Sequence, residues 1–304
     1  MRDVDAAAAL RAYLQPFDFT AEIDRECATF VPDTMEKQIA EFVSWLAPKA
    51  AKLSAPAAVP SSALPVSVKA NAAESLASPP MSRLCYLEEP ASQGKTCLLS
   101  VLSRRFRDDI VGVHFCKFSE PAQNEPARIV KSLAWQIAER IPEYKAELMR
   151  ILPSVKLAQS QSAMSLSTLD VWTRLLVEPL TAVSSTVASR LGGRKCVLLL
   201  DAADEVSDPL LNHLMALVGA CLPLLPPWIG LVLSVPCHDY DSRYNVCNPC
   251  FLHFDEVNVE ECGMIVRHHL RARGLSAMRI AGKDGAVTAV QFDVARTLLP
   301  CLQR

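Results

Sequence analysis

The chain has 304 residues, of which 50% are hydrophobic and 21% are charged, so it can bury one large core or two ordinary ones. Its net charge of −2 recommends neither a nucleic acid nor an anionic membrane surface as a partner. The 11 cysteines lie mostly within apolar runs, and the start of the chain, MRDVDA, has two acids where a signal peptide has basic residues. We therefore expect reduced thiols and a cytoplasmic location.

A helical segment and a linker are predicted before the first strand. Residues 6–14 are a candidate helix, and Asp33-Thr-Met-Glu36 resembles a capping box at the start of another helix. Apolar residues then repeat at helical spacing, at Ile39, Phe42, Val43 and Leu46. We expect this N-terminal helical segment, residues 1–47, to pack against the following domain. Residues 48–80 are rich in Ala, Ser and Pro and predict a flexible linker.

The stretch from Leu84 to Thr96 predicts a phosphate-binding loop. An apolar strand leads into Gly94-Lys-Thr96, and an amphipathic helix follows at once. The residues expected to contact a nucleotide are Ser92, Gln93, Gly94, Lys95, Thr96 and Cys97. The full motif has Gly at position 89, where this chain has Glu89. A left-handed backbone at that position would cost a non-glycine residue about 1–2 kcal/mol.

Strand-like and helix-like segments alternate through the rest of the chain. The expected strands are residues 109–118, 196–201, 228–235 and 251–254. The expected helices begin at Pro126 and Pro142 and also cover residues 168–180 and 209–220. This alternation predicts an α/β fold with a right-handed, doubly wound, mostly parallel sheet flanked by helices. Residues 259–273 predict the start of a small helical appendage.

Residues 214–235 carry no charge over a length that is sufficient to cross a bilayer. Three prolines, Pro223, Pro226 and Pro227, interrupt this stretch. We therefore expect a buried helix, a proline-rich turn and a buried strand, and no membrane partner. A membrane-anchored protein stays open as an alternative.

An acidic residue is predicted where the third strand ends. Four consecutive apolar residues precede Asp201, so it should lie at the carboxyl end of a central strand, where open α/β sheets bind ligands. Charge then assigns Lys95 to the β- and γ-phosphates, Thr96 to Mg²⁺, and Asp201 to the water shell of the metal. Asp204 or Glu205 is expected to orient or deprotonate an attacking water.

Two further clusters each have a structural and a functional interpretation. One set of side chains has ligand types that can bind zinc, but its spacing matches no standard module, so unpaired thiols are the default. This set is Cys237, His238, Cys247, Cys250 and His253. The basic run Arg104-Arg-Phe-Arg107 lies at the end of the helix after the loop, where cations suit the helix dipole. We interpret it as a solvated helix end rather than a nucleic-acid site.

Four sequence motifs of the chain resemble those of the NACHT-type members of the STAND class of signalling NTPases, especially the nephrocystin-like group. The resemblance covers about residues 83–272 and rests on Gly94-Lys-Thr96, His114-Phe-Cys116, Lys131-Ser-Leu-Ala-Trp-Gln-Ile137 and Leu200-Asp-Ala-Ala-Asp-Glu205. The last string looks like the extended Walker B motif of the family. An intervening strand between the two motifs fits the additional-strand class of P-loop NTPases.

The resemblance implies a NACHT-type domain at residues 81–256 and a partial helical appendage at residues 257–304. Such a domain would bind ATP (or GTP) with Mg²⁺, hydrolyse it slowly, and switch between a closed monomer and an oligomer or protein partners. The chain departs from the family at Glu89 and Ser92, where Gly is preferred, and at Ser234-Val-Pro236, which lacks the sensor Arg. It also stops before the winged-helix region. A degenerate NACHT domain that acts as a non-catalytic interaction scaffold is therefore the second hypothesis.

Overall fold

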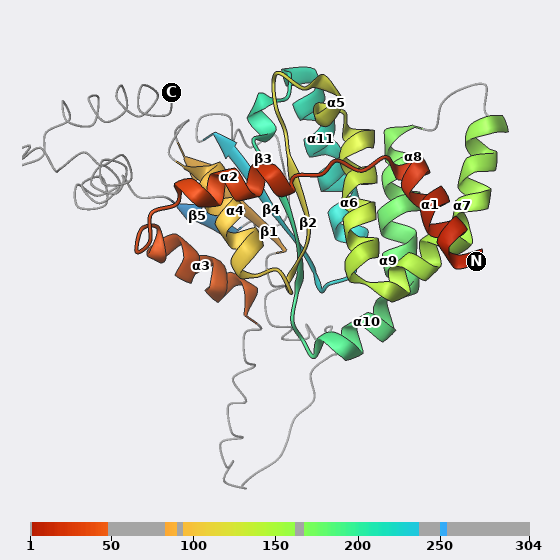
Figure 1. Ribbon diagram of the computed structural model, residues 1–304, viewed down its shortest axis with the longest axis horizontal. Coiled ribbons are helices and arrows are strands. Elements are labelled where there is room, and N and C mark those ends of the chain that lie inside the picture. The colour runs from red at the N-terminus through yellow and green to blue at the C-terminus, as the bar shows by residue number, and fades with distance from the viewer. Residues whose placement is uncertain (1, 48–82, 90–93, 162–166, 237–249, 254–304) are drawn as a thin grey trace, which may run out of the picture.

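The computed structural model describes residues 2–47, 83–89, 94–161, 167–236 and 250–253. Within these ranges a five-stranded sheet lies between two groups of helices (Figure 1). Its strands are β1 (Leu84–Glu89), β2 (Ile110–Phe115), β3 (Cys196–Asp201), β4 (Ile229–Pro236) and β5 (Cys250–His253). The strand order is β2-β3-β4-β1-β5, and every neighbouring pair is parallel. The predicted α/β class and parallel sheet are confirmed.

Helices cover both faces of the sheet. One face packs against α2 (Thr20–Thr29), α3 (Glu36–Leu46) and α4 (Lys95–Arg105). The other packs against α1 (Arg2–Leu14), α6 (Pro126–Arg140), α7 (Pro142–Gln161), α8 (Thr168–Trp172), a π-helix (Thr173–Val177), α9 (Glu178–Ala182) and α11 (Asp208–Cys221). Two short helices, α5 (Pro121–Asn124) and α10 (Ser184–Leu191), complete the connections. Because both faces are covered, every residue of β2 and β3 is buried.

The uncharged stretch at residues 214–235 divides into separate elements. Helix α11 ends at Cys221, a 3₁₀ turn covers Leu222–Leu224, and β4 begins at Ile229. The expected sequence of helix, turn and strand is confirmed. Across the residues described, no helix has both the length and the apolar character required to cross a membrane.

The N-terminal segment contacts both faces of the sheet. Leu10 and Leu14 of α1 join the core on the α6 side, whereas Phe42 and Trp45 of α3 join the core on the α4 side. The connection between α1 and α2 passes over β2, at one edge of the sheet (Figure 1). The N-terminal segment therefore packs against the sheet, as expected.

Helix α3 begins differently from the sequence expectation. The helix starts at Glu36, its N-cap is Met35 in a left-handed conformation (φ 58°), and no side chain caps it. The predicted capping box at residues 33–36 is therefore wrong. Val43, which we expected on the apolar face, is 42% exposed, and the buried apolar residues of α3 are Ile39, Phe42 and Trp45.

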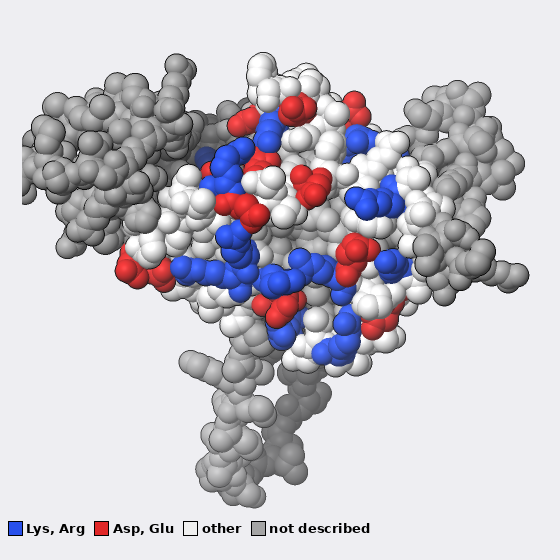
Figure 2. Space-filling model, in the orientation of Figure 1, with Lys and Arg blue, Asp and Glu red and all other residues white. Residues whose placement is uncertain are grey.

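The basic run at the end of α4 binds the N-terminal segment. Arg104 forms an ion pair with Asp24 of α2, and Arg105 lies 3.4 Å from the carboxylate of Glu36. The Arg105 guanidinium also lies 5.4 Å from the centre of the Phe30 ring. These side chains are exposed, as expected, so each pair contributes at most about 1 kcal/mol. Figure 2 shows acidic side chains beside the basic ones over this face of the molecule.

His114 is buried where the N-terminal segment passes over β2. The Phe17 and Phe19 rings meet its imidazole edge-on, at centroid distances of 5.7 and 5.1 Å. Its Nε2 lies 2.8 Å from the Gln123 carbonyl, which can only accept, so Nε2 carries the proton. Nδ1 has no hydrogen-bond partner among the described residues. Burial lowers the pKa of His114 to about 4.

We predict that acidification destabilises the fold through His114. The folded state holds the pKa of His114 at about 4, against an ordinary value of 6.5, so the unfolded chain binds more protons between these values. Stability should be complete above pH 6.5 and fall as the pH drops towards 4, by up to about 3 kcal/mol. Urea unfolding of wild type and His114→Gln across this range measures the effect.

The His114→Gln variant should show a flatter pH profile than wild type, because glutamine does not titrate. Replacement of His213, which is exposed on α11, by Gln is the matched control and should leave the wild-type profile in place. Equal slopes for wild type and His114→Gln would contradict the assignment.

Gly94 precedes α4 in a left-handed conformation (φ +91°), and Met35 packs directly against it. A Cβ at Gly94 would lie 2.7 Å from Met35 Cε. We predict that Gly94→Ala lowers the free energy of unfolding by about 1–2 kcal/mol from backbone strain alone, with a further loss from the Met35 contact. Urea unfolding measures both contributions.

The matched control for Gly94→Ala is Gly192→Ala at the end of α10, where φ is +59° and no atom lies within 4 Å of the added Cβ. Gly94→Ala should cost more than this control, and adding Met35→Ala should recover part of the difference. Equal costs for the two alanine variants would show that the Met35 contact has no energetic effect.

Candidate functional site

The strands that carry the two predicted motifs end at the same edge of the sheet. Strand β4 lies between β1 and β3, so the two motifs are separated by two strand spacings, or about 10 Å. Leu87 of β1 pairs with Ser234, and Leu200 of β3 pairs with Leu233, so Asp201 is level with Leu87 across the sheet. The predicted phosphate-binding loop begins beyond that level.

Helix α4 begins at Lys95, immediately after Gly94. Its 11 residues direct the positive end of the helix dipole and the unpaired amides of the first turn towards the loop. The Lys95 side chain is 8% exposed, and Thr96 is half-buried. This local structure suits an anionic ligand. Ser92 and Gln93 lie outside the described residues.

Glu89 is the last residue of β1 and pairs with Pro236 of β4. Among the residues that the structure describes, the non-glycine residues with positive φ are Gln15, Asp33, Met35 and Ala202, so Glu89 is not one of them. Its backbone is extended, and the cost of a left-handed conformation does not arise. The departure from the motif at this position therefore carries no backbone penalty.

Asp201 is 1% exposed and lies at the carboxyl end of β3, as the sequence predicted. The Ser234 hydroxyl donates a hydrogen bond of 2.5 Å to Asp201 Oδ1. The same hydroxyl oxygen accepts a hydrogen bond of 2.8 Å from the backbone N–H of Ala202. The backbone carbonyl of Asp201 accepts from the N–H of Cys116, 3.0 Å away at the end of β2. Asp201 is therefore tied to both neighbouring strands, to β4 through its carboxylate and to the end of β2 through its backbone carbonyl.

The chain turns sharply after Asp201. Ala202 adopts a left-handed conformation (φ 52°), and a 3₁₀ turn covers Ala203–Glu205. The exposed Glu205 carboxylate accepts a hydrogen bond of 2.8 Å from the backbone N–H of Phe118, in the loop after β2. The structure describes the backbone of Asp204 but not its side chain.

The loop after β2 is held by Asn124, which is 5% exposed. Asn124 accepts from the N–H of Lys117 and donates to the carbonyls of Lys117 and Glu205, at 2.9, 2.8 and 3.4 Å. Phe118 is 82% exposed on this held loop. The sequence did not predict that Asn124 and Phe118 lie next to Glu205. The loop after β2 contacts the turn after β3 only because β2 and β3 are neighbours in the sheet, and the sequence does not give that strand order.

Cys97 turns its thiol away from the predicted ligand. Its Sγ donates to the Glu26 carbonyl at 3.5 Å and lies 3.9 Å from the hydroxyl of Thr29, which donates to it. Burial raises the pKa of Cys97 to about 11, so the thiol is protonated. Cys97 can contact a nucleotide through its backbone amide, while its side chain binds α2.

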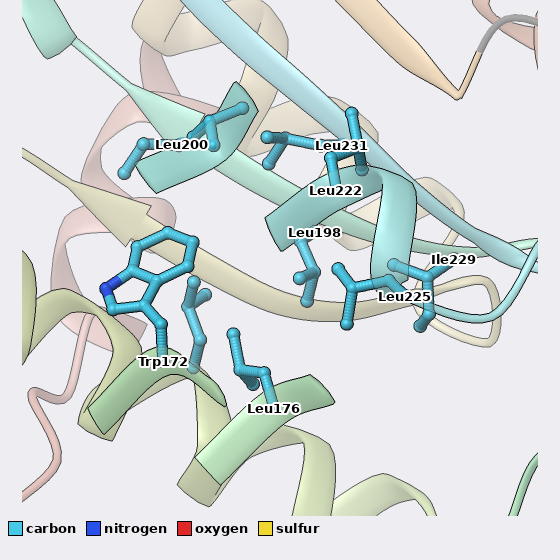
Figure 3. A pocket seen from close by; sticks show the side chains of 10 residues that line it. Trp172, Leu176, Leu198, Leu200, Leu222, Leu225, Ile229 and Leu231 are labelled. Atoms are coloured by element: carbon cyan, nitrogen blue, oxygen red, sulfur yellow. The ribbon is translucent and has the colours of Figure 1, made fainter. Parts of the chain in front are cut away.

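A small cavity lies between the sheet and the helices α6, α8 and α11, and is separate from the candidate site (Figure 3). Its volume is about 20 Å³, and its ten lining residues are all apolar, including Trp172, Leu176 and Leu198. An apolar cavity of this size stays dry and does not suit a nucleotide. The described residues also contain no group of three or more His, Cys, Asp or Glu side chains that could hold a metal.

The zinc hypothesis concerns mainly residues that lie outside the described part of the chain. Cys237, His238 and Cys247 lie outside the described residues. Cys250 and His253 are the first and last residues of β5, and the structure does not describe their side chains.

Comparison with known proteins identifies one family. Residues 69–228 match the family described as nephrocystin 3, N-terminal, and this match covers more than half of the chain. It includes β1 to β3, with Gly94, Lys95, Thr96 and Asp201, and it ends one residue before β4 begins. Comparison with curated proteins found no match. The chain belongs to the nephrocystin 3 N-terminal family.

Proposed function

We propose that the chain is a nucleotide-binding module of the NACHT type, which binds ATP (or GTP) with Mg²⁺ at the carboxyl edge of the sheet. One observation carries the proposal. The helix start at Gly94 and Lys95 and the buried Asp201 lie at the same edge, with β4 between their strands. This order matches the additional-strand class of P-loop NTPases, and a buried carboxylate opposite a buried lysine suits a metal–phosphate ligand.

The roles of the residues follow from their chemistry. The amides at the start of α4, with those of Ser92 and Gln93, would bind phosphate oxygens, and Lys95 would neutralise the β- and γ-phosphates. Thr96 would bind the metal directly, and Asp201 would bind through its water shell. A bound Mg²⁺ would supply charge neutralisation between the phosphates. Asp204 or Glu205 would orient or deprotonate the attacking water.

Slow hydrolysis would then drive a change between a closed and an associating form. The contacts around the site support such coupling, because the N-terminal segment and the site are joined. Met35 packs on Gly94, Cys97 binds α2, and Lys117 forms an ion pair of 2.7 Å with Glu22 of α2. A ligand that orders the start of α4 would therefore affect α2 directly.

A non-catalytic interaction scaffold is the second candidate, and a specific contact favours it. The carboxylate of Glu205 is engaged by the Phe118 amide, and a carboxylate held in this way is less available as a base. In this case nucleotide binding would be structural, and the rigidly held, 82% exposed Phe118 would suit a protein contact.

We predict that Lys95→Ala weakens binding of Mg·ATP about 10- to 100-fold, because it removes a charge-assisted contact to phosphate. Asp201→Asn should remove the gain in ATP affinity that Mg²⁺ gives, and should leave the ATP affinity measured in EDTA unchanged. Isothermal calorimetry with ATP and with GTP, each with and without Mg²⁺, tests both variants.

Lys145→Ala is the matched control, since Lys145 lies on α7 in an ion pair with Glu139, on the other side of the molecule from α4. It should bind nucleotide as wild type does. An unchanged affinity for Lys95→Ala would show that the assigned pocket is wrong.

We predict that Glu205→Gln separates the two candidate functions. Glutamine keeps an acceptor for the Phe118 amide, so the fold and nucleotide affinity should not change. If the module is catalytic, wild type should release phosphate slowly. Glu205→Gln should then be at least about 100-fold slower if Glu205 acts on the water, and as fast as wild type if Asp204 does. If it is a scaffold, neither protein should release phosphate above background. Glu120→Gln, an exposed residue of the same loop, is the control and should hydrolyse as wild type does.

A further inference from the structure

Ser234 lies between the two halves of the candidate site. It is on β4, after the apolar residues Leu231-Val-Leu233, and its exposure is 0%. It pairs with Leu87 of β1 on one side, and on the other it is level with Asp201 of β3. The side chain of Ser234 is therefore a buried hydroxyl at the height where the metal carboxylate is expected.

The two hydrogen bonds of the Ser234 hydroxyl fix its orientation. A serine hydroxyl has one proton to donate, and here that proton is directed to Asp201 Oδ1 at 2.5 Å. Its oxygen accepts from the Ala202 amide at 2.8 Å. A bond to a carboxylate is charge-assisted and therefore stronger than a bond between neutral groups. One buried hydroxyl thus fixes both the carboxylate and the residue that follows it.

The turn after Asp201 depends on the same hydroxyl. Ala202 holds a left-handed conformation, which costs a non-glycine residue about 1–2 kcal/mol. The bond from its amide to Ser234 offsets part of that cost, and the Ala202 carbonyl accepts from the N–H of Glu205 at 2.9 Å. Ser234 therefore acts on the carboxylate through its donor and on the 3₁₀ turn through its acceptor.

We propose that Ser234 is a positioning residue for the metal ligand of this site. Its hydroxyl holds Oδ1 of Asp201, fixes the rotation of the carboxylate, and so presents Asp201 to the water shell of the Mg²⁺ of a bound nucleotide. The inference rests on the proposed function, because it assigns the metal to Asp201. Partners that orient a metal-binding carboxylate typically change metal affinity 10- to 100-fold when removed.

Three variants test the proposal in the full chain. Ser234→Thr and Ser234→Val have nearly the same shape and differ in the hydroxyl. Ser234→Ala removes the hydroxyl without adding volume. The measurement is the ratio of ATP affinity with Mg²⁺ to ATP affinity in EDTA, by calorimetry, with GTP in parallel. Ser234→Val and Ser234→Ala should lower this ratio at least 10-fold, and Ser234→Thr should keep it within about 3-fold of wild type.

Ser132→Ala controls for a general loss of stability. Ser132 is also 0% exposed, and its hydroxyl accepts from the Phe17 amide at 3.3 Å, away from Asp201. This variant should lower the unfolding temperature and leave the Mg²⁺ ratio unchanged. Because the ratio compares the same folded sample with and without metal, a loss of stability alone does not alter it.

The outcomes separate the inference from the proposed function. Equal Mg²⁺ ratios for Ser234→Thr and Ser234→Val, both like wild type, would overturn the positioning role while nucleotide binding stands. A wild-type protein that binds neither ATP nor GTP would overturn the proposed function and the inference with it. Loss in the valine and alanine variants, with retention in the threonine variant, supports the assignment.

Discussion

The position of β4 between β1 and β3 is the constraint on which the candidate site depends. If β1 and β3 were neighbours, their carboxyl ends would be only one strand spacing, about 5 Å, apart. With β4 inserted, the ends of β1 and β3 are two strand spacings apart, about 10 Å. The end of β4 then becomes part of the candidate site, and the buried hydroxyl of Ser234 donates directly to Asp201.

The fold was largely predictable from the sequence because its strands are buried on both faces. Continuous apolar runs, such as the four residues before Asp201, identify such strands without any alternation, and acids or glycines mark their ends. The less regular parts were not predictable. Helix α2 contains no fully buried residue; its Ile23 packs only partly buried against the core, and polar contacts join it to α4 and the β2 loop.

The candidate site was predictable residue by residue but not in its connections. Lys95, Thr96 and Asp201 follow from motif spacing, whereas the bonds of Ser234 to Asp201 and of Phe118 to Glu205 depend on strand order and register. The motif also predicted a possible left-handed backbone at Glu89. In the structure this position is the last residue of a strand, so its backbone is extended. Sequence motifs identify the candidate residues, whereas the strand order and register of the sheet determine what those residues contact.

The N-terminal segment has a consequence for how the protein must form. It precedes the sheet in the chain, and its partners lie far along the sequence: Trp45 packs on Gly230 of β4, and the Trp45 carbonyl accepts from Lys195. Phe17 and Phe19 therefore stay without their β2 partners until β2 has been made, and Trp45 stays without its partners until β4 has been made. Contacts of such long sequence separation slow folding and expose apolar surface to aggregation. A recombinant fragment cut at the family boundary, residues 69–228, would lack both this segment and β4, and would leave the sheet incomplete.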